Sequence, residues 1–207
     1  APVDCCESGS TLRFLIPLAS LTGQEITFVG RGRLMERPQS VYEELYRAKG
    51  LRFEQTPSGL TVEGLLSSGD YTLAGNVSSQ FISGLLFALP LLAGTSTLRL
   101  LPPVESRSYI DMTRAVQAAF GVESRWLDET TLEISGGQEY HPCDYTVEGD
   151  YSQAAFPAVL GAVCGGVTIT GLAPETLQGD AAILDILRRC GAKFTQTEAG
   201  ISFEKAP

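Results

Sequence analysis

The chain repeats one short pattern at intervals of roughly 70 residues. Residues 71–80 read Tyr-Thr-Leu-Ala-Gly-Asn-Val-Ser-Ser-Gln, and residues 145–153 read Tyr-Thr-Val-Glu-Gly-Asp-Tyr-Ser-Gln. Each copy precedes an apolar stretch, a short alternating run and an amphipathic stretch that ends in glycine. With one earlier partial copy, the final glycines are Gly50, Gly121 and Gly191, 71 and 70 residues apart. This period is too long for the common solenoid repeats, so the sequence predicts a duplicated globular unit.

The clearest copy, residues 70–136, predicts the order β-α-β-α-β-β. We expect the strands at 71–74, 96–100, 122–127 and 130–134, and the helices at 78–91 and 109–120. The same order is expected over residues 145–203. A partial copy over residues 11–63 has lost most of its first strand. Strands that alternate with helices in this way indicate the α/β (α+β) class.

A domain boundary is expected in the polar stretch 136–144, which contains glycine and proline and falls between two copies. It divides the chain into residues 1–143 and 144–207.

Composition excludes several classes of function. The 207 residues carry a net charge of −9, which argues against a nucleic-acid partner because such partners require a basic surface. No stretch has the ~18 uncharged apolar residues that a membrane span needs, and no secretory signal is visible. The five cysteines form no Cys-x-x-Cys pair and the only histidine is His141, so we expect no metal site. Reduced thiols predict a cytoplasmic protein.

Residues 7–11 form the first of four polar clusters that could carry chemistry. They read Glu-Ser-Gly-Ser-Thr and open an expected helix. Gly9 would let a ligand approach the unpaired N–H groups of the first turn, which favour an anion. A plain helix cap is the alternative interpretation.

Residues 30–38 form the second cluster, with Arg31, Arg33 and Arg37 close to glycines. Pro38 is expected to start the next helix. Such a loop can present a guanidinium fork to a carboxylate or a phosphate. A solvated loop is the alternative.

Residues 75–80 form the third cluster, in which two hydroxyls and an amide stand at a helix start. They could hold a phosphate by neutral hydrogen bonds, or Ser78 and Ser79 could simply cap the helix. The repeat of this turn has Asp150 in place of an asparagine, so the two copies should differ in role. Residues 106–109 (Ser-Arg-Ser-Tyr) form the fourth cluster and offer two hydroxyls, a phenol and a cation.

Taken together and in this order, the motifs resemble those of the EPSP synthase (3-phosphoshikimate 1-carboxyvinyltransferase) family. The matching pieces are Glu-Ser-Gly-Ser-Thr-Leu-Arg-Phe (7–14), Gly-Arg-Leu-Met-Glu-Arg-Pro (32–38), Gly-Asn-Val-Ser-Ser-Gln-Phe (75–81), Ser-Arg-Ser-Tyr-Ile-Asp-Met-Thr (106–113), Val-Glu-Gly-Asp-Tyr-Ser (147–152) and Gln-Gly-Asp (178–180). The resemblance extends over essentially the whole chain.

The resemblance implies a fold of two domains, each built from three β-α-β-α-β-β units, which form an inside-out α/β barrel of the enolpyruvyl transferase type. This chain would be an incomplete part of it. Residues 1–143 would be most of the first (N-terminal) domain, with about two units, and residues 144–207 the first unit of the second (C-terminal) domain. The implied reaction transfers the enolpyruvyl group of phosphoenolpyruvate to the 5-hydroxyl of shikimate 3-phosphate, giving EPSP and phosphate. This is a step of the shikimate pathway to aromatic amino acids, and it uses no metal or organic cofactor.

The resemblance also implies roles for individual residues. Those expected to bind shikimate 3-phosphate are Ser78, Ser79, Gln80, Ser106 and Tyr109. Those expected to bind phosphoenolpyruvate are Gly9, through its backbone, Arg33 and Gln80. No catalytic residue of the family is expected within this chain. Glu7 stands where many relatives have asparagine, and it receives no binding role.

Segments of the family that precede and follow these motifs have no counterpart in the sequence. We therefore expect the isolated chain to have little or no transferase activity. A non-catalytic fragment or binding module of the same fold is one alternative. An enolpyruvyl transferase acting on a UDP-sugar is another, disfavoured because no cysteine lies in a comparable Arg-rich or Gly-rich loop.

Overall fold

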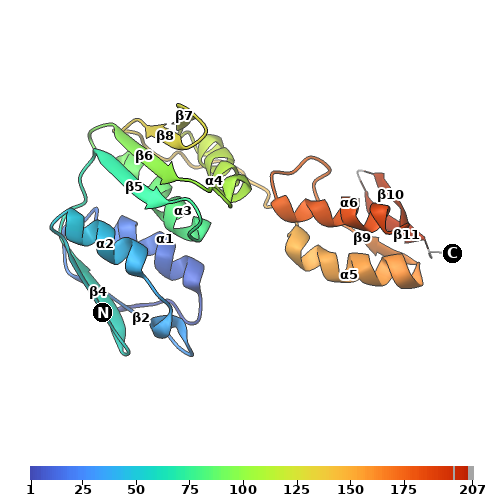
Figure 1. The fold of residues 1–207 in the computed structure, drawn as a ribbon, viewed down its shortest axis with the longest axis horizontal. Coiled ribbons are helices and arrows are strands. Elements are labelled where there is room, and N and C mark those ends of the chain that lie inside the picture. The colour runs from blue at the N-terminus through green and yellow to red at the C-terminus, as the bar shows by residue number, and fades with distance from the viewer. Residues whose placement is uncertain (198, 205–207) are drawn as a thin grey trace. The chain divides into compact units, whose positions relative to one another are not determined.

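The computed structural model describes residues 1–197 and 199–204 and divides the chain into two compact units, residues 1–143 and 144–207 (Figure 1). Each unit has its own hydrophobic core. Within the described residues the strands form three separate sheets and no closed barrel. No helix in this part of the chain has the length and apolar character needed to cross a bilayer.

The first half of the first unit is the partial repeat copy. Its elements are, in order, β1 (Val3–Asp4), α1 (Gly9–Ala19), β2 (Ile26–Val29), the 3₁₀ turn η1 (Leu34–Glu36), α2 (Ser40–Ala48), β3 (Arg52–Thr56) and β4 (Gly59–Glu63). The strands form one sheet in the order β1-β2-β4-β3, and β1 is parallel to β2. The first strand, β1, is two residues long.

The second half of the first unit is the complete copy. Its elements are β5 (Asp70–Ala74), α3 (Ser79–Ala88), the 3₁₀ turn η2 (Leu89–Leu91), β6 (Ser96–Leu101), α4 (Arg107–Ala119), β7 (Arg125–Trp126) and β8 (Thr131–Ile134). The predicted order β-α-β-α-β-β is confirmed. The third strand is shorter than expected, at two residues. The sheet runs β5-β6-β8-β7, with β5 parallel to β6.

Helix α3 lies at the centre of the first unit, between the two sheets (Figure 1). It has no charged residue, and its residues are buried around most of its circumference, as expected of a helix that packs on all sides. Its closest neighbour is α1: a β-carbon at Gly84 would collide with the carbonyl oxygen of Arg13. The Tyr42 hydroxyl of α2 lies 2.9 Å from the carbonyl oxygens of both Arg13 and Phe81. One buried phenol therefore joins all three helices.

The second unit repeats this order without its first strand, in a smaller body. Its elements are α5 (Tyr151–Cys164), β9 (Val167–Ile169), the 3₁₀ turn η3 (Gly179–Ala181), α6 (Ala182–Arg189), β10 (Lys193–Thr197) and β11 (Gly200–Glu204). The three strands form an antiparallel sheet in the order β10-β11-β9. Tyr151 and Phe203 are among the residues that form the core between this sheet and the helices.

The strand expected at the start of the second unit, near Tyr145, is not formed, so this part of the prediction is wrong. One hydrogen bond that such a strand would make is present, from the Gly149 N–H to the Gly171 carbonyl at 2.7 Å. Its equivalent in the complete copy joins Gly75 to Leu101. The possible partner β9 has only three residues, and Val147 is 81% exposed. With a short partner and no apolar layer to bury one face, a strand gains too little stability to form.

The three repeated glycines, Gly50, Gly121 and Gly191, have positive φ angles of 69°, 83° and 89°. Each follows the capping residue of α2, α4 or α6. The N–H of the next residue bonds back to a carbonyl in the last helical turn, at 2.9, 2.9 and 3.0 Å. This is the glycine-dependent end of a helix. The repeat found in the sequence is thus a repeat of structure.

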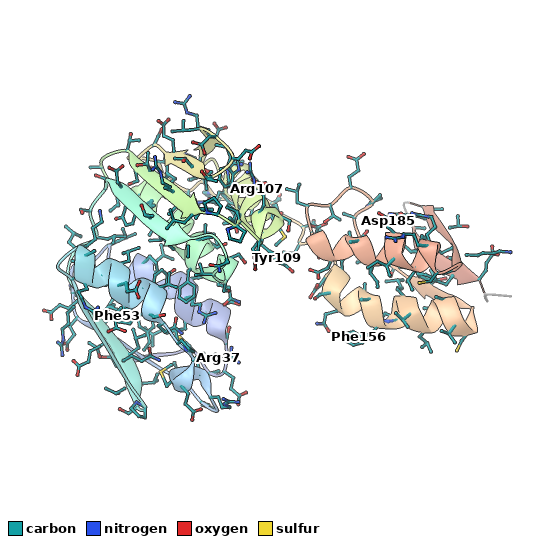
Figure 2. The ribbon with its side chains drawn as sticks, in the orientation of Figure 1. Arg37, Phe53, Arg107, Tyr109, Phe156 and Asp185 are labelled. Atoms are coloured by element: carbon teal, nitrogen blue, oxygen red, sulfur yellow. The ribbon has the colours of Figure 1, made fainter. Side chains whose placement is uncertain are left out.

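Helix α5 has an exposed apolar face. None of its 14 residues is charged. Its outward side chains are Phe156, Val159, Leu160 and Val163, which are 45–75% exposed; Figure 2 shows Phe156 outside the helix. Phe156 is sixth after the cap Asp150, as Phe14 is sixth after the cap Ser8 in α1. Because Phe14 packs on Phe87 of α3, at 5.2 Å between rings, this face of α5 corresponds to a helix-packing face in the first unit.

Candidate functional site

The first polar cluster opens α1, as predicted. The Ser8 hydroxyl caps the helix by accepting the Thr11 N–H at 3.1 Å, and Gly9 is the first helical residue. Gly9 is buried, and a β-carbon there would lie 2.9 Å from a terminal nitrogen of Arg37 and 3.8 Å from Oε1 of Gln80. The start of α1 thus lies against one cation from the Arg-rich loop and one amide from α3.

Gln80 links the starts of α1 and α3. Its Nε2 donates to the Ser10 hydroxyl at 2.9 Å, and its Oε1 accepts from the Arg13 guanidinium at 2.9 Å. The partners are 70 and 67 residues away in sequence. The structure therefore brings together Gly9 and Gln80, two of the residues expected to bind phosphoenolpyruvate.

Arg13 is the residue that sequence reasoning missed. Its guanidinium also donates to the Gln39 side chain at 3.3 Å and to the Pro38 carbonyl at 3.4 Å, and it lies 4.4 Å from the ring centre of Phe81. Burial lowers the pKa of Arg13, as does the nearby charge of Arg37. The guanidinium stays charged because its ordinary pKa is far above neutrality. Arg13 is the only charged residue in α1, and a lone charge in an apolar helix was the signal that could have identified it.

The Arg-rich loop is exposed, and its two ends differ in their contacts. Arg33 has an 87% exposed side chain that pairs with Glu36 at 3.3 Å. With Arg37 and Pro38, these two line a cavity of about 290 Å³. Arg33 shares this cavity with Arg37, which reaches Gly9. No described contact joins Arg33 to Gln80.

The structure corrects the expected start of the helix after this loop and shows where Glu7 lies. Pro38 does not begin the next helix: α2 starts at Ser40, after the cap Gln39, and the carbonyl of Pro38 accepts from Arg13 at 3.4 Å. The carboxylate of Glu7 lies against the loop, since a β-carbon at Gly32 would be 3.2 Å from it. Glu7 is thus beside the residue that precedes Arg33.

Ser78 and Ser79 stand at the start of α3, next to Gln80. Ser78 is exposed and caps the helix by accepting the Gln80 N–H at 3.4 Å. Ser79 is the first helical residue and is half-buried. The capping interpretation is therefore confirmed for Ser78, and capping leaves the other lone pair and the hydroxyl proton able to meet a ligand.

The fourth cluster lies beside the same turn. The Glu105 N–H bonds to the Gly75 carbonyl at 3.2 Å, which places the residue before Ser106 against the turn that leads to Ser78. Ser106 precedes α4 and makes no capping bond with its side chain. Tyr109 is 39% exposed in the first turn of α4.

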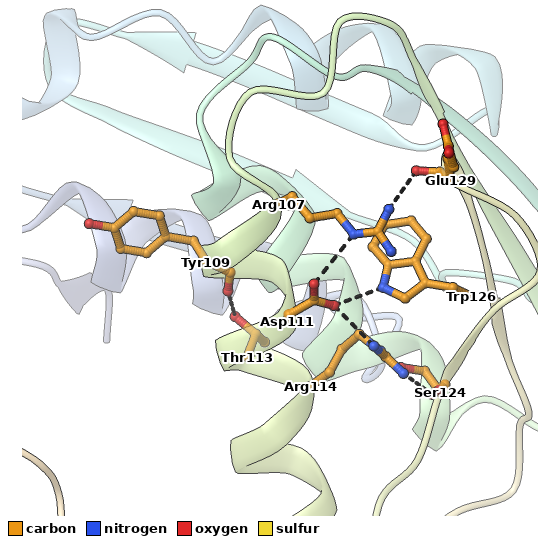
Figure 3. A network of polar contacts seen from close by, with 8 residues as sticks. All are labelled: Arg107, Tyr109, Asp111, Thr113, Arg114, Ser124, Trp126 and Glu129. Atoms are coloured by element: carbon orange, nitrogen blue, oxygen red, sulfur yellow. Dashed lines mark hydrogen bonds and ion pairs between the residues drawn. The ribbon is translucent and has the colours of Figure 1, made fainter. Parts of the chain in front are cut away.

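The side chains of Arg107 and Tyr109 lie on different sides of α4, so the cation of this cluster does not lie beside the Tyr109 ring (Figure 3). Its Nε pairs with Asp111 at 3.3 Å and a terminal nitrogen donates to the Glu129 carbonyl at 2.8 Å. The guanidinium stacks on the Trp126 ring, 3.7 Å from its centre. The ring of Trp126 in β7 is thus the platform for this arginine.

The repeat of the third cluster carries Asp150 as the cap of α5. Its carboxylate accepts the Ser152 N–H at 2.8 Å and the Ser152 hydroxyl at 2.6 Å. These hydrogen bonds lower the pKa of Asp150. An ionised carboxylate at this helix start disfavours a second anion, which supports the expectation that the two copies differ in role.

A larger cavity, of about 690 Å³, lies between α2 and β5 and touches none of the residues named for the site. Its walls are largely apolar, and we assign no chemistry to it. Among the described residues no group of three or more His, Cys, Asp or Glu side chains could hold a metal ion, and the five cysteines are unpaired.

Comparisons with known proteins agree on one family. The profile of EPSP synthase (3-phosphoshikimate 1-carboxyvinyltransferase) matches residues 1–207. A 3-phosphoshikimate 1-carboxyvinyltransferase of Clostridium kluyveri is 46% identical over 199 residues, covering 95% of this chain and 46% of the relative. One of Brachyspira hyodysenteriae is 42% identical over 196 residues, covering 95% and 47%.

The fold agrees with that of a solved EPSP synthase of Acinetobacter baumannii. The TM-score is 0.73 at 20% identity, over 99% of this chain and 47% of the other. The chain spans about half the length of the relatives that it matches. The matching profile and relatives show that the chain belongs to the EPSP synthase family.

Proposed function

We propose that this chain supplies part of an enzyme that transfers the enolpyruvyl group of phosphoenolpyruvate to the 5-hydroxyl of shikimate 3-phosphate. In the reaction, the methylene carbon of phosphoenolpyruvate gains a proton while the 5-hydroxyl attacks the neighbouring carbon and loses its own. The tetrahedral intermediate then loses a proton from its new methyl group and expels inorganic phosphate, which restores the carbon–carbon double bond. The chain belongs to the EPSP synthase family, and both substrates are anions, which suits the two helix starts described above.

The observation that carries the proposal is the Gln80 side chain at the start of α3, which makes two hydrogen bonds of 2.9 Å to α1, one to Ser10 and one to Arg13. Two sets of unpaired helix N–H groups are thereby held near each other, and each favours an anion. Ser78, Ser79 and Gln80, with Ser106 and Tyr109, hold shikimate 3-phosphate in this proposal. Gln80 would lie between the two substrates.

Phosphoenolpyruvate in this proposal lies at the backbone of Gly9 and at Arg33. Arg33 is exposed and paired only loosely with Glu36, so its guanidinium must exchange that partner for the substrate. An exposed ion pair costs little to break, about 0–1 kcal/mol. We further propose that residues 1–143 belong to the first domain and 144–207 to the second, in a cytoplasmic enzyme that needs no cofactor.

The experiment that tests the activity is an exchange of segments. The stretch of the Clostridium kluyveri relative that matches this chain is replaced by the chain, and phosphate release from the two substrates is measured. We expect turnover by the hybrid and little or none by the isolated chain, because the remaining active-site groups lie outside it. A folded hybrid without turnover would contradict the proposal.

Binding can be tested on the chain itself by calorimetry with shikimate 3-phosphate. Ser78→Ala/Ser79→Ala removes two hydroxyls, and at ~1 kcal/mol for each hydrogen bond the affinity should fall by at least about tenfold. Ser152→Ala, in the copy with Asp150, is the matched control and should bind like the parent. Equal heats for the parent and the double variant would remove these serines from the site.

A further inference from the structure

Asp111 is the centre of a cluster that joins α4 to β7 and to the residues on either side of it (Figure 3). Its Oδ1 accepts from the indole of Trp126 at 2.7 Å and from Arg114 at 3.0 Å. Its Oδ2 accepts from Nε of Arg107 at 3.3 Å. Arg114 continues to Ser124, with Nε 3.0 Å from the hydroxyl. One carboxylate thus connects three donors from two elements.

Arg107 connects the first turn of α4 to this cluster. It is the first residue of α4, and its guanidinium is held by Asp111, by the Glu129 carbonyl and by the face of Trp126. These contacts hold it on the side of α4 away from the Tyr109 ring (Figure 3). A planar guanidinium suits this geometry, since it can stack and donate in fixed directions together.

The start of α4 has no side-chain cap of its own. Ser106 does not cap the helix, in contrast to Ser8, Ser78 and Asp150 at the starts of α1, α3 and α5. Its hydroxyl is not committed to the helix N–H groups. Two sets of contacts hold this turn: the bond from the Glu105 N–H to the Gly75 carbonyl, and the side-chain contacts of Arg107, which directly follows Ser106.

We propose that Asp111 is a positioning residue: through Arg107 it fixes the first turn of α4, so that Ser106 and Tyr109 face the phosphorylated substrate from a set position. This inference rests on the proposed function for its ligand. In this proposal Arg107 does not contact the ligand, although it lies in sequence between Ser106 and Tyr109, which do.

The first test needs no ligand. In the 207-residue chain, amide exchange is measured at Tyr109 and Ile110, whose N–H groups bond to the Ser106 carbonyl. Asp111→Asn should speed their exchange by about tenfold, the effect of losing a coupling of ~1.4 kcal/mol, and should leave the amides of α3 unchanged. Arg125→Met is the control, because Arg125 lies in the same hairpin and pairs only with Glu133 at 2.7 Å.

The second test uses shikimate 3-phosphate and calorimetry. Arg107→Met and Arg107→Lys should weaken binding about equally, by ~3-fold to 10-fold, because lysine keeps the charge but cannot stack and bridge as the planar fork does. The salt dependence of the affinity should be the same in Arg107→Met as in the parent, since no charge facing the ligand has been removed.

The outcomes separate the two ideas. If the parent does not bind while exchange at Tyr109 and Ile110 responds as expected, the proposed ligand is wrong and the fixing of the turn stands. If Arg107→Lys binds as the parent does and Arg107→Met does not, Arg107 acts by charge and the inference is overturned. Unchanged exchange in both Asp111→Asn and Arg107→Met overturns it as well. If Asp111→Asn does not fold, as judged by circular dichroism, the Arg107 variants decide.

Discussion

The Gln80 side chain should contribute measurably to the stability of the first unit. Gln80→Ala removes one hydrogen bond to a charged guanidinium, from Arg13, and one to a neutral hydroxyl, of Ser10. Bonds to charged groups contribute about 1.5–3 kcal/mol and neutral ones about 0.5–1.5 kcal/mol. Because Gln80 is only half-buried, water replaces part of this, and Arg13 keeps its bonds to Gln39 and Pro38. We expect a loss of about 2 kcal/mol in the free energy of unfolding.

The assay is urea unfolding followed by the fluorescence of Trp126, which reports on the first unit alone. Gln153→Ala is the matched control. It removes the same residue type from the corresponding motif of the other unit, where Gln153 is exposed, and exposed substitutions usually change stability by less than about 0.5 kcal/mol. A Gln80→Ala curve that overlays the Gln153→Ala curve would refute the idea that this amide holds the two helix starts together.

Three further predictions concern ionisation and association. Partial burial alone would raise the pKa of Asp111, but its bonds from Trp126 and two arginines lower it below the usual value. Because a depressed pKa stabilises the folded state above the unfolded pKa of about 3.9, this stabilisation should be lost as the pH falls below about 4. The emission of Trp126 should therefore change below about pH 4 but not between pH 5 and 8. Burial raises the pKa of Tyr71 to about 12. A raised pKa stabilises the fold below the unfolded value of about 10, and this contribution is lost between about pH 10 and 12. The absorbance of Tyr71→Phe at alkaline pH should therefore lack one of the late-titrating phenols of the parent. The exposed face of α5 should make the chain self-associate; the mass from light scattering should fall towards the monomer in Phe156→Glu and not in Val147→Glu, and an unchanged mass in Phe156→Glu would contradict the role of this face.

Much of the fold follows from local signals. The glycines at the ends of α2, α4 and α6 were visible as a period, because only glycine readily takes a positive φ there. The starts of α1 and α3 were visible as serines that cap. These signals depend on neighbours within one turn of helix, which a sequence displays directly.

The errors have long-range causes. The strand expected near Tyr145 has the same residue types as β5, but its partner β9 is too short and nothing covers Val147. At the start of α2, which lies beyond Pro38, the Pro38 carbonyl bonds to Arg13, 25 residues away. Neither the short partner strand nor the contact of Arg13 with Pro38 can be inferred from the local sequence pattern.

The candidate site was predicted in part for the same reason. Motifs located the starts of α1 and α3, but not that one amide would join them, since Gln80 and its partners come from different repeat copies. Arg13 and the direction of Arg107 were likewise fixed by tertiary contacts, with Gln39 and Trp126.

The three helices that end in glycine allow the same substitution, glycine to alanine, to be compared at three equivalent positions of one chain. Alanine at Gly50 or Gly191 meets no atom within 4 Å, so each substitution should cost only the backbone strain of a positive φ, about 1–2 kcal/mol. Alanine at Gly121 meets the same strain and, in addition, the His141 ring at 2.8 Å. The difference between Gly121 and the other two positions would isolate, within a single polypeptide, how much a crowded neighbour adds to an identical change of backbone chemistry.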